Sequence, residues 1–88
     1  MTSQRAINIW GVLHQKEHQD IYKLLMKHKK LGLTISQMSE FLNLPILSLL
    51  AHLSELLKVE IVHSQHQAGT VTYKINWSTV QNFLQFQR

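Results

Sequence analysis

The sequence predicts a mainly helical protein with one β-hairpin, its elements ordered α-α-α-α-β-β-α. Apolar residues recur every three to four positions before residue 58 and again near the C-terminus, which is typical of helices. Between these regions, Ile61 to Ile75 is rich in β-branched residues with Gly69 near its middle, which indicates two strands and a turn. With 88 residues, 44% of them hydrophobic, we expect residues 1–88 to form a single domain with a thin core.

Two helices are expected before residue 30. Closely spaced apolar residues from Gln4 to Leu13 predict a short, mostly buried helix in which Gly11 is a weak point. From Gln19 to Lys29 the apolar residues fall at i, i+3 and i+4, which marks one face of a second helix. The segment Leu31-Gly32-Leu33 then ends this helix.

The next segment contains start and stop signals for two more helices. Thr34 and Gln37 have the spacing of a capping box, in which each side chain satisfies a free amide at a helix start. Asn43 tolerates the left-handed conformation needed where that helix stops. Pro45 suits the start of the following helix because its missing amide hydrogen costs little there. That helix carries a broad apolar stripe: Ile46, Leu49, Leu50, Leu53, Leu56 and Leu57.

The hairpin is expected to consist of strands at Ile61–Gln65 and Thr70–Ile75 joined by a loop at His66–Gly69. Ser78 and Gln81 repeat the capping spacing at the start of a last helix. Two helices joined by a three-residue turn and followed by a hairpin form a winged helix-turn-helix. The helix-turn-helix would occupy about residues 34–57 and the wing about residues 61–75.

The segment Leu42–Val62 resembles the ArsR-type repressor segment that typically runs LGLSQSTVSRHLKVLREAGLV, and it matches without a gap, including the His52-Leu53 pair. Leu13–Leu25 is similar to the family's LSDPTRLRILRLL, and Gly69–Ile75 to its GRWVYYRL, aligned on Tyr73. The resemblance implies a cytoplasmic transcriptional repressor that binds double-stranded DNA as a homodimer, with the second helix of the motif in the major groove.

Charge is consistent with this implied partner. Nine Lys and Arg against five Asp and Glu give a net charge of +4, which favours polyanions. Lysines cluster between Lys23 and Lys30, either as a solvated helix end favourable to the helix dipole or as a phosphate-contacting patch. The candidate DNA-binding residues are Lys27, Lys29, Lys30, Ser48, His52, His66 and Lys74. For His52, a structural role is the favoured alternative to a phosphate contact.

The recognition helix departs from the family pattern. At its groove-facing positions Ile46, Leu47, Leu50 and Ala51 offer no hydrogen bonds, so direct base reading is restricted to contact with thymine methyl groups. Two interpretations stay open. Either contacts to the DNA backbone and the wing supply most of the affinity, or the helix buries against another surface and the protein is a winged-helix protein-interaction module.

The terminal helices carry more apolar surface than a thin monomer core can cover, so we expect them to form the dimer interface. Its residues would be Ala6, Ile9, Trp10, Leu13, Trp77, Val80, Phe83 and Leu84.

Other functions have little support in the sequence. The absence of cysteine excludes disulfides, thiolate metal sites and cysteine nucleophiles. His14 and His18, or His63 and His66, have spacings that could suit a metal, yet we expect no metal or cofactor. With one aspartate, no suggestive carboxylate pair and no glycine-rich phosphate loop, we expect no enzyme. No segment has the length and apolarity of a signal peptide or membrane span, so no membrane partner is expected.

Overall fold

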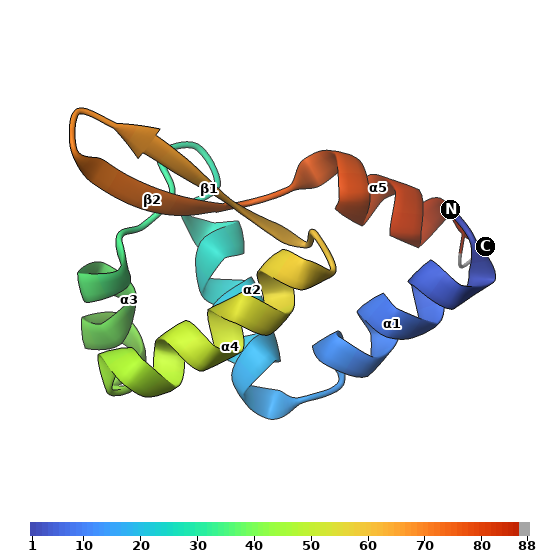
Figure 1. Cartoon of the computed structure of the whole chain (residues 1–88), viewed down its shortest axis with the longest axis horizontal. Coiled ribbons are helices and arrows are strands. Elements are labelled where there is room, and N and C mark those ends of the chain that lie inside the picture. Colours follow the sequence, from blue (N-terminus) through green and yellow to red (C-terminus); the bar gives the residue numbers. More distant parts are fainter. Residues whose placement is uncertain (87–88) are drawn as a thin grey trace.

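The computed structural model describes residues 1–86, so the last two residues of the predicted domain lie outside it. Its elements follow the predicted order, and the mainly α fold with one hairpin is confirmed (Figure 1). They are α1 Ser3–Leu13, α2 Lys16–Lys27, α3 Ile35–Leu42, α4 Ile46–Lys58, β1 Val62–Gln67, β2 Thr70–Ile75 and α5 Trp77–Phe86. Figure 1 shows α1 and α5 at one end of the long axis, and the hairpin turn, α3 and the start of α4 at the other.

The helix-turn-helix forms where its capping signals predict it. The Thr34 backbone N–H donates to Gln37 Oε1 at 2.9 Å, and the Gln37 N–H donates to Thr34 Oγ1 at 3.2 Å, which completes the capping box. Asn43 ends α3 in the left-handed conformation with φ 53° and ψ 46°. Pro45 is the N-cap of α4 and not its first helical residue.

The two helices of the motif are bent by 110° relative to each other. Among residues 1–86, no single helix is long and apolar enough to cross a membrane. Only α3 and α4 counted together reach that length and apolarity, and they do so as this bent pair.

The wing differs from the prediction at its turn. β1 extends to Gln67, two residues past the predicted end, so the expected four-residue loop is a two-residue turn at Ala68 and Gly69. Both turn residues have positive φ, 50° and 79°, which is the backbone twist that suits a tight hairpin. The alanine at the first position hid this turn, because sequence signals for it favour Asn, Asp or Gly there.

The last helix also starts differently from the prediction. Ser78 lies inside α5 and does not cap it. Instead the Asn76 side-chain oxygen accepts from the Thr79 N–H at 3.4 Å, and the Asn76 carbonyl accepts from the Val80 N–H at 3.1 Å. Asparagine is a strong N-cap residue, so Asn76 fixes the entry into α5.

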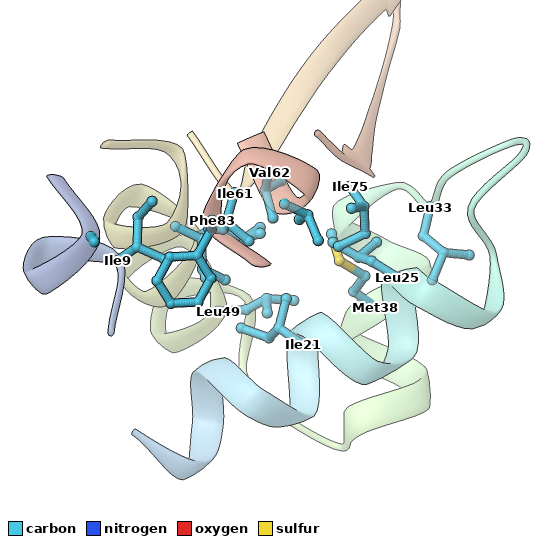
Figure 2. Packing of buried hydrophobic residues seen from close by; sticks show 14 residues of the cluster. Ile9, Ile21, Leu25, Leu33, Met38, Leu49, Ile61, Val62, Ile75 and Phe83 are labelled. Atoms are coloured by element: carbon cyan, nitrogen blue, oxygen red, sulfur yellow. The ribbon is translucent and has the colours of Figure 1, made fainter. Parts of the chain in front are cut away.

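The core draws residues from all seven elements, and Figure 2 shows them pointing into a common interior. Ile9, Ile21, Leu25, Met38, Leu49, Leu56 and Ile61 are fully inaccessible to solvent. Four residues predicted for the dimer interface belong to this core and not to the surface: Ala6, Ile9, Val80 and Phe83. The prediction was wrong for these four because α1 and α5 pack on each other within one protomer.

The wing is joined to the helices by a short bridge, in which Leu33 and Tyr73 exchange backbone hydrogen bonds of 2.8 and 3.1 Å. Gly32, with φ +72°, makes this approach possible. A Cβ on Gly32 would lie 2.6 Å from the Tyr73 carbonyl oxygen.

We predict that Gly32→Ala destabilises the protein by more than about 2 kcal/mol, since it combines left-handed strain with a backbone clash. Chemical denaturation of the variant and the wild type measures this difference.

Two other glycines provide matched controls. Gly69→Ala carries the same strain in open space and should cost about 1 kcal/mol. Gly11→Ala, inside α1 with nothing within 4 Å, should stabilise by about 0.5–1 kcal/mol. Equal losses at Gly32 and Gly69 would show that the bridge to the wing tolerates a side chain.

Candidate nucleic-acid interface

The packing of α4 determines which of its side chains face solvent. Leu49, Leu53 and Leu56 are buried, so the opposite side of the helix carries Leu47, Ala51 and Ser54. Leu47 is 82% exposed. Ser48 is exposed beside this line on one flank, and Ile46 and Leu50 are partly exposed on the other. We call Leu47, Ser48, Leu50, Ala51 and Ser54 the outer face of α4.

The wing has one wholly polar face. The antiparallel register pairs Val62 with Ile75, and both point into the core. Because side chains alternate along a strand, the other face carries three cross-strand pairs. These pairs are His63 with Lys74, Gln65 with Thr72, and Gln67 with Thr70. We call these six residues the polar wing face.

The same register separates two residues that the sequence suggested as joint DNA contacts. Lys74 lies on the polar wing face, whereas His66 pairs with Val71 on the face that continues the core side. Sequence reasoning missed Gln65, Gln67, Thr70 and Thr72 as a group. A correct turn assignment would have found them, since the turn length fixes which residues pair.

The acidic residues do not neutralise the lysines near the motif. Three ion pairs form within residues 1–86: Arg5–Glu60 at 3.3 Å, Lys16–Asp20 at 2.8 Å and Lys58–Glu55 at 3.4 Å. The hydrogen bond that the Lys16 ammonium donates to the Asp20 carboxylate raises the pKa of Lys16. In the described chain none of these pairs includes the remaining lysines, Lys23, Lys27, Lys29, Lys30 and Lys74.

The three predicted lysine contacts near the end of α2 lie in different surroundings. Lys27 lines a shallow groove between α2 and α3 together with Lys23 and Phe41. The Lys29 ammonium lies 5.5 Å from the centre of the Trp77 ring, which directs it toward α5. Lys30 is exposed in the loop after α2.

His52 is held within the fold by a second histidine. Its Nδ1 lies 3.1 Å from His18 Nε2, and the Nδ1 of His18 lies 2.7 Å from the Val12 carbonyl oxygen. If each ring carries its proton on Nδ1, His52 donates to His18 Nε2 and His18 donates to the Val12 carbonyl oxygen. These two hydrogen bonds connect the end of α1 through α2 to α4. We call this the histidine relay. Its geometry favours the structural interpretation of His52.

The relay also bears on the metal interpretation of the His14 and His18 spacing. His14 is exposed, whereas His18 is buried and its two ring nitrogens already have partners. Within residues 1–86, no group of three or more His, Asp or Glu side chains is placed to hold a metal ion. His18 was not recognised from the sequence as a core residue, because its partners lie on other elements.

The terminal helices leave a second apolar surface exposed. Trp10 is 59% and Leu84 57% exposed, whereas Leu13 and Trp77 are half-buried against the core. Trp10 stacks on Phe83 with ring centres 6.4 Å apart. Two exposed neighbours, Ile7 and Phe86, were not in the predicted interface set. We call the exposed set the terminal-helix patch: Ile7, Trp10, Leu84 and Phe86.

We predict that His52→Ala lowers the free energy of unfolding by about 1–3 kcal/mol, because it leaves a buried acceptor on His18 without a partner. The matched variants are His18→Leu and the double variant. The relay requires that the double variant lose at least about 0.5 kcal/mol less than the sum of the two single losses. Strictly additive losses in denaturant titrations would contradict it.

No family model matches the chain, and no curated protein sequence matches it. Several solved structures do match the chain. An ArsR-like transcriptional regulator from Rhodococcus sp. RHA1 superposes with a TM-score of 0.84 at 13% identity, over 94% of this chain and 76% of that one. HlyU from Vibrio cholerae superposes with a TM-score of 0.75 at 21% identity, over 97% of this chain and 91% of that one. The transcriptional regulator HlyU from Vibrio vulnificus superposes with a TM-score of 0.73 at 19% identity, over 97% of this chain and 86% of that one. The chain therefore has the winged helix-turn-helix fold of the ArsR-type regulators.

Proposed function

We propose that the protein is a DNA-binding transcriptional regulator that acts as a homodimer, with α4 in the major groove and the wing on the sugar-phosphate backbone. The observation that carries the proposal is the separation of two surfaces along the long axis. The wing turn and the start of α4 lie at one end, and α1 and α5, which carry the terminal-helix patch, lie at the other (Figure 1). One end can therefore meet DNA while the other meets a second copy. Repression, as the ArsR resemblance implies, is part of the proposal.

Contacts to phosphates would supply most of the affinity. The polar wing face carries no acidic residue, and Lys74 has no acidic partner in the part of the chain that the structure describes. Lys27, Lys30, Ser48 and His66 stay candidates for further backbone contacts. Each phosphate neutralised by a lysine releases condensed counterions, which makes binding dependent on salt concentration.

A second candidate function is a protein-interaction module. The observation that favours it is the exposed apolar surface of the helix-turn-helix, above all Leu47 and the 61% exposed Phe41. The two functions differ in their response to salt. Phosphate contacts give a steep dependence of affinity on salt, and apolar docking gives almost none.

We predict that log K for binding of a random-sequence duplex falls linearly with log salt, by about 0.9 units per phosphate contact. Lys74→Gln removes the charge, keeps a polar side chain one atom shorter, and should flatten this slope by about one unit. Lys16→Gln is the control, since Lys16 is already paired with Asp20, and it should leave the slope unchanged. Fluorescence anisotropy at several salt concentrations measures the salt slope of the wild type and of both variants. Absent or salt-independent binding by the wild type would favour the protein-interaction module.

We predict that the wild type sediments as a dimer at tens of micromolar and that Leu84→Glu weakens the dimer at least tenfold. The cause is the cost of burying a carboxylate without a partner. Leu31→Glu changes a leucine that is 84% exposed in the loop after α2, and it should leave the dimer intact. A monomeric wild type, or equal effects of the two substitutions, would contradict an interface at the terminal-helix patch.

A further inference from the structure

We infer that the outer face of α4 selects DNA by the C5-methyl groups of thymine in the major groove, so that thymine-rich sites bind most tightly. The inference rests on the proposed function and names the feature of DNA that this face recognises. It starts from what the exposed side chains can do. Leu47, Leu50 and Ala51 are apolar, and only Ser48 and Ser54 offer hydrogen bonds, each through a single hydroxyl.

No side chain on the outer face can read a base by two hydrogen bonds. That mode needs the fork of Arg, Asn or Gln, or the carboxylate of Glu or Asp. The first charged residue of α4 is Glu55, and its carboxylate is already paired with Lys58. In the major groove the thymine methyl is the apolar feature that ordinary DNA bases present, and it distinguishes A·T pairs from G·C pairs.

The cost of burying polar base edges strengthens the selection. Leu47 is 82% exposed, and against a G·C pair it would cover acceptors and a donor without replacing their hydrogen bonds to water. Against a thymine methyl it would instead remove apolar surface from water. The outer face therefore gains binding free energy at a thymine methyl and loses binding free energy at a G·C pair.

Charge identifies DNA, and not an apolar protein groove, as the occupant of this face. Lys74 lies on the polar wing face, and Lys23 and Lys27 line the groove beside α3. Asp20 lines the same groove, but its carboxylate pairs with Lys16, so none of these three lysines forms an ion pair among the described residues. An apolar face accompanied by unpaired cations is complementary to a ligand that combines methyl groups with phosphates. Duplex DNA is such a ligand.

The test compares DNA pools that differ only in C5-methyl groups. One random-sequence duplex pool is copied with dTTP, with dUTP, or with dUTP and 5-methyl-dCTP. Anisotropy titrations then measure the affinity of the wild type for each pool over a range of salt concentrations.

Uracil removes the methyl and keeps every hydrogen-bonding group, and 5-methylcytosine returns a methyl at the same ring position. Since one buried methyl corresponds to roughly fourfold in affinity, the thymine pool should bind at least threefold more tightly than the uracil pool. The 5-methylcytosine pool should recover part of the loss and not all of it, because its methyl groups lie on G·C pairs, whose polar base edges Leu47 would also cover.

Two leucines of nearly equal exposure provide the matched variants: Leu47, 82% exposed on the outer face, and Leu31, 84% exposed in the loop after α2. Leu47→Ser should reduce the thymine-to-uracil ratio toward one with an unchanged salt slope, and Leu31→Ser should keep the wild-type ratio. A wild-type ratio of one with a steep salt slope would overturn the inference and leave the proposed function standing. A ratio that persists in Leu47→Ser would also overturn it, because uracil would then act through DNA shape. No salt-dependent binding to any pool would instead refute the proposed function.

Discussion

The rotational setting of α4 in the core is the constraint on which the surface chemistry depends. Leu49, Leu53 and Leu56 are buried where α4 packs on α2, α3 and β1, and together they fix which side of the helix faces solvent. Burial of each of these leucines contributes about 1.5–3 kcal/mol. The sequence of α4 is apolar on nearly every side, and burial of this one stripe leaves Leu47 and Ala51 exposed. The apolar outer face is therefore a consequence of the fold and not of loose packing.

The hairpin is held in place by similar constraints. Val62 and Ile75 bury one face of its base, and the Leu33–Tyr73 bridge ties β2 to the loop before α3. These contacts leave the opposite face free to be polar from base to turn. The histidine relay adds a fixed link between α1, α2 and α4. Together these links fix the positions of the wing and of α4 relative to the core.

Local signals in the sequence predicted the fold well, because helix caps act within four residues. Thr34, Gln37 and Asn43 have the predicted roles, and the element order is confirmed. Two local features were still missed. Asn76 and not Ser78 caps α5, and the hairpin turn was hidden by an alanine with positive φ, and with it the composition of the polar wing face. The other missed features depend on distant partners. The burial of Ile9 and Phe83 depends on how α1 and α5 pack. The partnership of His18 with His52 joins residues 34 positions apart.

The central claim, that the outer face of α4 and the polar wing face contact DNA, is tested most directly by NMR. A ¹⁵N-labelled sample is titrated with a short duplex at low salt, and changes in the backbone amide shifts are followed residue by residue. The account predicts the largest changes at residues 46–51 and 63–74, with α1 and α5 almost unaffected. Changes confined to residues 3–13 and 77–86, or no changes at all, would contradict it.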